Sequence, residues 1–106
     1  MDDEFVRLTA VSAPGEGQAR FSARLSEFWT HMLRDFQEDF EKVYAETIEF
    51  EAAGDRLERH YLCEESVVEL VAREMDSWGI EHPPIDWDDR WNRYEAVAGE
   101  WMQIEH

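Results

Sequence analysis

Apolar residues between positions 20 and 52 recur at intervals of three, four and seven, the spacing that places side chains on one face of an α-helix. The stripe consists of Phe21, Leu25, Phe28, Trp29, Met32, Leu33, Phe36, Phe40, Val43, Tyr44 and Ile48. From Trp29 to Phe50 the steps of four and three continue as in packed or coiled helices. The pattern predicts a helix over residues 20–52, about 50 Å long. We expect it either to break near residues 43–50, where VYAETIEF also tolerates a strand, or to project toward a partner helix.

A second helix is predicted over residues 56–78. Gly54 and Asp55 have the residue types of a helix stop and of the next N-cap, and Glu58 lies where a capping box needs a carboxylate. The apolar stripe comprises Leu57, Tyr61, Val68, Val71, Met75 and Trp78, with Gly79 as the stop. Another capping-box pattern, beginning at Ser66, leaves open a division into two shorter helices.

The last helix is predicted over residues 87–104. It follows a linker, IEHPPI, in which two prolines disfavour helical geometry. Its side chains at steps of four and three are Trp87, Trp91, Tyr94, Ala98 and Trp101. Core packing explains this face, but Trp87 and Trp91 are also candidate anchors of a protein interface, where Trp and Tyr are common.

Residues 1–17 are expected to form an N-terminal arm. EFVRLTAV at 4–11 is compatible with a short strand or an extended arm, and SAPGEG at 12–17 has turn chemistry. The predicted fold is therefore all-α: a single domain over residues 1–106, built as a three- or four-helix bundle with a short extended or single-strand N-terminal segment. The alternative is an α+β fold with a small sheet.

The charge of the chain is strongly one-sided. Against 26 Asp and Glu stand 10 Lys and Arg, a formal net charge of -16, whereas about 2 to 8 charges suit a small soluble domain. Adaptation to high internal salt, a solvated surface and a negative face for a basic partner each account for this charge, and six Phe and five Trp argue against the first. The charge argues against direct binding of nucleic acid and of anionic membranes, because their phosphates would be repelled. No membrane span or signal peptide is recognised, and Cys63 is the only cysteine, so a cytoplasmic location is expected.

The spacing of chemically active residues predicts no metal, no cofactor and no catalytic residues. His31 lies four residues before Asp35. His60 lies three residues before Cys63 and four before Glu64. Neither group makes the paired Cys and His sets of structural zinc sites. Carboxylate pairs are too abundant to be specific, and we recognise no nucleophile elbow or phosphate-binding glycine loop. The chain is therefore expected not to be an enzyme.

The stretch DFQEDFEKVYAETIEFE at residues 35–51 is densely negative. Carboxylates on one helix face lie about 5 to 6 Å apart, and phosphates of one strand advance about 3.4 Å along a duplex. A row of carboxylates therefore resembles a nucleic-acid backbone to a basic groove. The predicted partner-binding residues are Asp35, Glu38, Asp39, Glu41, Glu46, Glu49, Glu51, Trp87 and Trp91.

These observations predict a non-enzymatic inhibitor that presents an acidic surface to a basic groove of a nucleic-acid-handling protein, as a phage anti-defence or anti-CRISPR protein would. One alternative is an immunity or antitoxin protein that neutralises a basic nuclease toxin. Another is a helical structural or assembly protein that forms a homo-oligomer. This last alternative needs the seam of Trp29, Phe36, Val43 and Phe50 to pair between copies.

Overall fold

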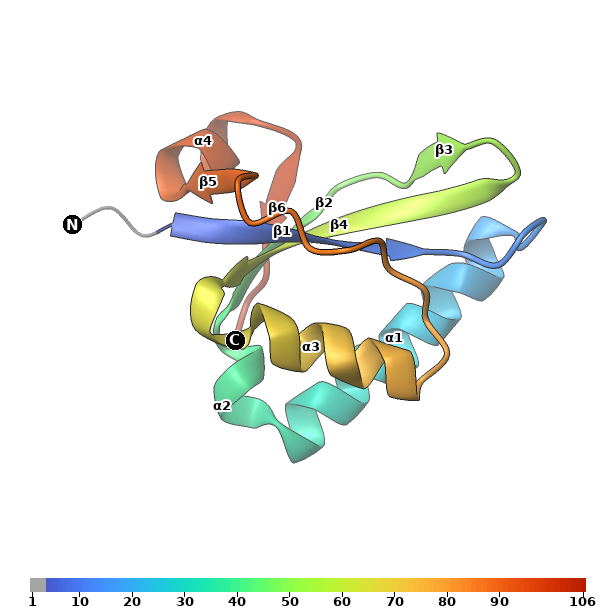
Figure 1. The fold of residues 1–106 in the computed structure, drawn as a ribbon, viewed down its shortest axis with the longest axis horizontal. Coiled ribbons are helices and arrows are strands. Elements are labelled where there is room, and N and C mark those ends of the chain that lie inside the picture. Colours follow the sequence, from blue (N-terminus) through green and yellow to red (C-terminus); the bar gives the residue numbers. More distant parts are fainter. Residues whose placement is uncertain (1–3) are drawn as a thin grey trace.

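Six antiparallel strands form one curled sheet, and helices cover one of its faces (Figure 1). The computed structural model describes residues 4–106, apart from the side chains of Val97 and Ala98. The strands are β1 (Glu4–Val11), β2 (Val43–Thr47), β3 (Glu51–Ala53), β4 (Arg56–Glu64), β5 (Arg90–Asn92) and β6 (Trp101–Gln103). The helices are α1 (Gln18–Asp35), α2 (Gln37–Phe40), α3 (Glu65–Ser77) and α4 (Arg93–Ala98). The strand order is β5-β1-β4-β2-β6, and β3 pairs with β4. The predicted all-α bundle is therefore wrong, and the chain is α+β.

The predicted helix over residues 20–52 ends at Asp35. α1 follows the predicted stripe and buries Phe21, Leu25, Phe28 and Met32. Phe36 then leaves helical geometry, with φ of -137° and ψ of 46°. After the single turn of α2, alternate residues of β2 are buried and Val43 and Thr47 are β-branched, which favours a strand. The continuous helix that could pair with a second copy does not form.

The first part of the predicted helix over residues 56–78 is the strand β4. Gly54 and Asp55 form the two-residue turn between β3 and β4. Gly54 has a φ of 65°, and type II′ hairpins place Gly at this first turn position because its φ must be positive. β4 pairs with β1 along one edge and with β2 and β3 along the other. α3 supplies the remaining helix, and Gly79, with a φ of 68°, follows its end as predicted.

The predicted helix over residues 87–104 is also wrong. The chain forms β5, the short helix α4 and β6 in its place. Asn92 caps α4, because its side-chain oxygen accepts a hydrogen bond from the backbone N–H of Glu95 at 2.9 Å. The linker before it runs back along the sheet, where Glu81 bridges to Val11. The aromatic residues of this segment are thus divided among a loop, the two strands and α4.

Of the two alternatives for residues 4–11, the structure has the strand, β1, and not an extended arm. β1 lies between β5 and β4 and pairs with both. Its alternation separates the two faces of the sheet. Val6, Leu8 and Ala10 are buried in the main core against α1 and α3, whereas Phe5 and Thr9 belong to the opposite face.

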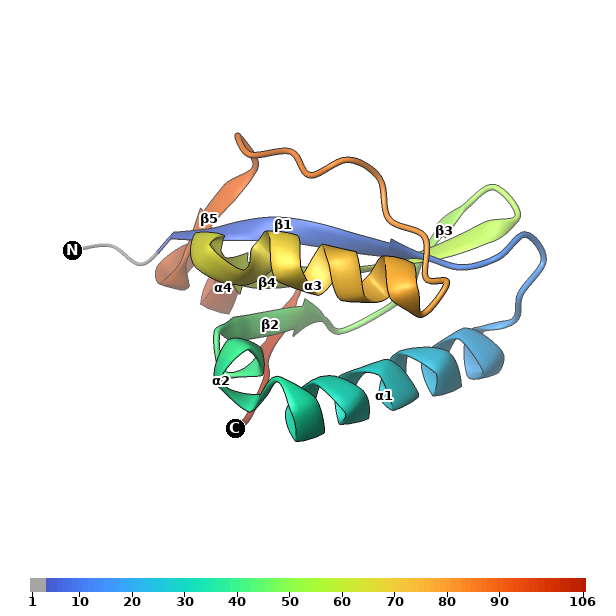
Figure 2. The same ribbon diagram turned by 60° about the horizontal axis from the view of Figure 1, so that its bottom comes forward.

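We call these the covered face and the open face. The covered face is sealed by α1, α2 and α3, which lie on the same side of the sheet in both views (Figures 1 and 2). The open face has a second, smaller core at one end, beside α4, formed by Phe5, Ala45, Leu62 and Ala96. Its other end carries the β3–β4 hairpin, which lies far from α4 in both figures. Thr9 and His60 lie on the open face toward this hairpin.

Candidate functional site: the acidic hairpin end of the sheet

The residues predicted to form one acidic row are divided between the two ends of the molecule. Asp35, Glu38 and Glu41 lie at the end of α1 and around α2, all exposed. Glu49 and Glu51 lie at the β3 end, opposite α2 along the long axis in both views (Figures 1 and 2). The division follows from the change of direction after Phe36, so the expected helical row does not form. Asp39, in α2, is half-buried.

Asp35 is already paired. Its carboxylate lies 3.1 Å from Nδ1 of His31 and 3.3 Å from Nε of Arg34. Glu46 is half-buried on the covered face, where its carboxylate lies 3.4 Å from Nη2 of Arg59. Burial raises the pKa of Glu46, and the nearby Arg59 acts in the opposite direction. These two residues are therefore less suited to meet a partner than the exposed carboxylates.

The two predicted tryptophan anchors have different surroundings. Trp87 is 36% exposed and keeps its place as a surface candidate. Trp91 packs edge-on against Trp101, with ring centroids 5.5 Å apart, and its Nε1–H donates to Asp89 at 2.9 Å. Trp91 belongs to the smaller core on the open face, so packing accounts for it.

A groove with an acidic lining lies at the β3 end. We call it the hairpin groove; its volume is about 390 Å³, and its lining is Thr47, Ile48, Glu49, Phe50, Glu51, Gly99 and Glu100. It forms because the chain after β2 meets the start of β6, where the N–H of Ile48 donates to the carbonyl of Glu100 at 3.0 Å. Ile48 is 57% exposed. The groove therefore combines three carboxylates with an apolar surface.

Arg59, a cation that contacts two residues of this lining, is already engaged. Arg59 donates from Nε and Nη2 to the carbonyl of Thr47 at 3.2 and 3.0 Å. Its guanidinium also lies 4.7 Å from the centroid of the Phe50 ring. Among the described residues, neither Glu49 nor Glu100 has an ion-pair partner, so both carboxylates are available to a cation from outside.

His60 connects the groove to the open face of the sheet. Its side chain is buried between Thr9 and Glu51: Nδ1 lies 2.7 Å from Oγ1 of Thr9, and Nε2 lies 2.9 Å from Oε2 of Glu51. Glu58 precedes His60 by two residues on the same strand and faces Glu51 across the hairpin. One ligand atom from each of Glu51, Glu58 and His60 lies within 4.8 Å of the others. We call these three residues the His60 cluster.

The sequence prediction missed this cluster because it assigned residues 51 and 58 to different helices. The sequence did contain a signal for the cluster, because Gly54 and Asp55 lie between two short segments that can form strands, a pattern that also indicates a two-residue hairpin turn. Such a turn pairs Ala53 with Arg56 and therefore Glu51 with Glu58, as the structure shows.

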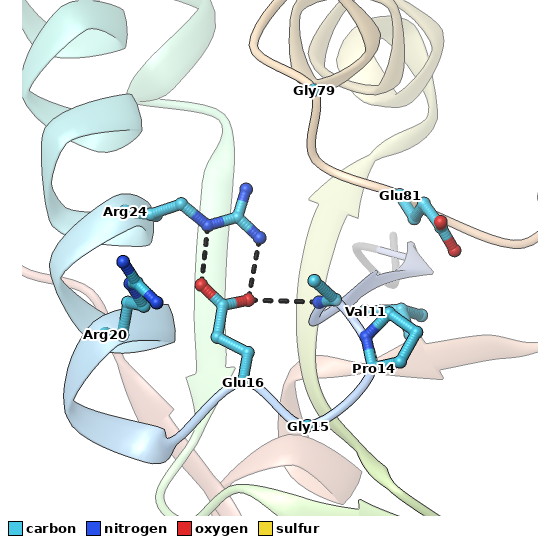
Figure 3. Close-up of a pocket in the computed structure, with 9 residues that line it drawn as sticks. Val11, Pro14, Gly15, Glu16, Arg20, Arg24, Gly79 and Glu81 are labelled. Atoms are coloured by element: carbon cyan, nitrogen blue, oxygen red, sulfur yellow. Dashed lines mark hydrogen bonds and ion pairs between the residues drawn. The ribbon is translucent and has the colours of Figure 1, made fainter.

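A second groove lies at the start of α1 (Figure 3). Arg24 donates two hydrogen bonds to the carboxylate of Glu16, at 2.8 and 2.9 Å. The same carboxylate accepts a hydrogen bond from the backbone N–H of Ala13 at 3.0 Å. The hydrogen bond from Arg24 is the main reason that the pKa of Glu16 is lowered. This ion pair joins the 12–17 loop to α1, so the guanidinium of Arg24 is not free for a ligand. Arg20 and Glu81 line opposite sides of the groove.

A third hollow, of about 290 Å³, lies between α1 and the sheet. Two buried polar atoms near it, Nε1 of Trp29 and the hydroxyl of Tyr61, have no hydrogen bond of good geometry. Burial raises the pKa of the Tyr61 phenol, and Trp29 beside it acts in the opposite direction. Cys63 is fully buried, which raises the pKa of its thiol to about 12, so it is a poor nucleophile.

Comparisons with family models, curated proteins and solved structures find no match for this chain. Within residues 4–106, none of the helices combines the length and apolar character needed to cross a lipid bilayer. The function must therefore be inferred from the site itself.

Proposed function

We propose that this chain is a non-enzymatic inhibitor whose hairpin groove receives a lysine or arginine from the basic groove of a nucleic-acid-handling protein. The observation that carries the proposal is the lining of the groove. Glu49, Glu51 and Glu100 surround it, and the exposed Ile48, which directly precedes Glu49 in the chain, also lines it. A long cationic side chain has the matching character, because its aliphatic stem covers apolar surface while its charged end stays among carboxylates.

The net charge of -16 supports the same partner. A strong single-sign field attracts an oppositely charged protein and accelerates its association. A nucleic-acid-binding groove contains Lys and Arg that are placed to neutralise phosphates. The carboxylates of the hairpin groove would take the place of those phosphates, and the molecule would compete with nucleic acid for the groove. This role is that of an anti-defence protein encoded by a phage and acting in the host cytoplasm.

The oligomer alternative loses its support, because its seam is not on one helix. Trp29 lies on α1, whereas Val43 lies on β2 and is fully buried. No observation separately favours an immunity protein over the proposed inhibitor.

A competition experiment tests the proposal. The wild-type protein is immobilised, exposed to a bacterial host lysate and eluted with DNA; the dissociation constant is then measured for each purified protein that DNA displaces. Glu49→Gln combined with Glu100→Gln removes two groove charges. We expect this variant to bind the displaced protein at least about tenfold more weakly, since each buried charge pair lost at an interface is costly.

The matched control is Glu38→Gln combined with Glu41→Gln, which removes the same number of charges at the α2 end. It should change the dissociation constant less than about threefold, because dissolved ions screen charges that lie more than a Debye length from the bound partner. Equal loss in both variants would mean that net charge alone drives binding. The absence of any basic protein displaced by DNA would refute the proposed inhibitor.

A further inference from the structure

We infer that the His60 cluster is a binding site for a divalent transition-metal ion, with Zn²⁺ as the best match. Glu51 comes from β3, and Glu58 and His60 come from β4. The one-atom ligands that these side chains offer lie within 4.8 Å of one another. The inference rests on two features beyond that proximity: two like charges that face each other with no lysine or arginine paired to either among residues 4–106, and a histidine ring held in one orientation.

The like charges face each other directly across the hairpin. Glu51 and Glu58 occupy paired positions in β3 and β4, so their side chains project from the same face. Carboxylates in this arrangement destabilise a sheet. Arg56 pairs with Glu81, and Arg59 pairs with Glu46. Within residues 4–106, His60 is the one residue that forms an ion pair with either carboxylate, so a bound cation would remove the repulsion.

The imidazole of His60 is fixed by a neighbour on β1. Thr9 and His60 are paired positions, and Oγ1 of Thr9 lies 2.7 Å from Nδ1. The side chain of His60 is 8% exposed. In the metal-bound form Nδ1 would donate its proton to Thr9, and Nε2 would give its lone pair to the ion in place of its present hydrogen bond to Glu51. A hydrogen bond from the second ring nitrogen is the usual arrangement in metal-binding histidines.

His31, in the same molecule, is a histidine that contacts two carboxylates in an arrangement unsuited to a metal ion. Its Nδ1 faces Asp35 at 3.1 Å, and its Nε2 faces Glu74 at 3.0 Å. The two carboxylates therefore lie against different ring nitrogens, and one ion cannot bridge all three groups. In the His60 cluster a neutral hydroxyl occupies Nδ1, which leaves the carboxylates and Nε2 for a common ion.

The ligand set determines the class of metal. One imidazole nitrogen with two carboxylates suits Zn²⁺ and other divalent first-row transition metals better than Mg²⁺ or Ca²⁺, which prefer oxygen ligands alone. Three protein ligands with water in the remaining position form a familiar open zinc site. Glu51 is exposed and Glu58 is half-buried, so both carboxylates can rotate toward the ion.

Metal binding would also regulate the hairpin groove, a consequence that rests on the proposed function. Glu51 belongs both to the groove and to the His60 cluster. A metal ion that holds its carboxylate would leave Glu49 and Glu100 to meet the partner. We therefore expect Zn²⁺ to weaken partner binding.

Titration calorimetry on chelator-treated protein, with ZnCl₂ as the probe, tests the site without any partner. We expect one saturable site per chain, with affinity lowered at least about tenfold by His60→Gln and by Glu58→Gln. Glu58→Gln is the safer variant, because this side chain is not fully buried. Glu49→Gln is the control and should bind as the wild type does. If the three variants bind Zn²⁺ with the same affinity, or if the wild type shows no saturable site, the inference is wrong.

Thr9 is a positioning residue in this site, and it has its own readout. Removing a partner of this kind costs about 10–100-fold in metal affinity. Thr9→Val should therefore weaken Zn²⁺ binding, and Thr9→Ser, which keeps the hydroxyl, should restore it. Failure of restoration with a correctly folded Thr9→Ser protein would exclude the role of the hydroxyl. Because these titrations contain no partner, their failure would leave the proposed inhibitor untouched.

Discussion

The covered face of the sheet carries the main apolar core, whereas the open face carries polar side chains at its hairpin end. On the covered face, Phe28 and Leu8 are almost completely buried among apolar neighbours. On the open face, the hairpin end carries His60 between Thr9 and Glu51, although Leu62, two residues farther along β4, is again buried. Two residues on the same face of β4, His60 and Leu62, thus have different surroundings. Side chains at the hairpin end can therefore be changed without removing the core, so the roles proposed for them can be tested by mutation.

The largest effect is expected on the covered face. Phe28 on α1 is fully buried, and Phe28→Ala should lower the free energy of unfolding by about 3–5 kcal/mol, from lost burial and the cavity left behind. Denaturant unfolding followed by circular dichroism measures this change. The control is Ile48→Ala on the exposed hairpin side, expected to change stability by about 0.5 kcal/mol or less. Similar losses in both variants would contradict the division between the faces.

A smaller loss is expected when the buried His60 loses its neighbour. Thr9→Val keeps the shape of the side chain and removes the hydroxyl that lies 2.7 Å from Nδ1. A buried polar group left without a partner costs about 1–3 kcal/mol. The same unfolding measurement, made on chelator-treated protein, should show this loss. Thr30→Val is the comparison, because Thr30 is an exposed residue whose hydroxyl donates to the carbonyl of Ser26 at 2.8 Å; it should lose less.

An increase in stability is expected when one of the two facing carboxylates of the hairpin is removed. Glu58→Gln removes the repulsion from Glu51 across the two strands, and we expect a gain of about 0.2–1 kcal/mol in the free energy of unfolding. The gain should shrink as salt is added, because salt screens the repulsion. Glu69→Gln, at an exposed position on α3, serves as the control for net charge. A gain of the same size in that variant would show that the local pair is unimportant.

The sequence predicted a helix where α1 lies, because this helix presents one apolar stripe to one core, but the predicted end at residue 52 was wrong. For β2 the continuous helix was wrong and the strand alternative was right, because Val43 and Thr47 continue the steps of four and three by coincidence and also fit a period of two. The predicted helix was also wrong for β4, because this strand is central: Tyr61, Leu62 and Cys63 are all buried. A strand covered on both faces has no polar alternation to reveal it.

The candidate site was only partly predictable for a related reason. Glu49 and Glu51 were predicted as partner-binding residues, and both line the hairpin groove. Glu100 was missed because β6 brings it to the groove from the far end of the sequence. His60 was dismissed because helical spacing offered it only Cys63 and Glu64, whereas strand pairing offers Thr9 and Glu51.

The smallest expected effects concern two carboxylates whose pKa values are shifted in opposite directions. The pKa of Glu16 is lowered, chiefly by the hydrogen bond from Arg24. Its ionised form therefore stabilises the fold above the ordinary pKa of a glutamate, and this contribution is lost as the pH falls through the lowered value. Glu16→Gln should reduce stability at neutral pH by less than about 1 kcal/mol, and the difference should disappear in acid.

Glu46 should respond with the opposite sign. Burial raises its pKa, so its stabilising contribution is present below the ordinary pKa and is lost as the pH rises through the raised value. Glu46→Gln, which resembles the protonated acid, should be more stable than the wild type at neutral pH and equal to it in acid. Thermal unfolding of both variants between acid and neutral pH measures the two trends. If Glu46→Gln is destabilised at neutral pH, the ion pair with Arg59 outweighs burial, and this carboxylate resembles Glu16 after all.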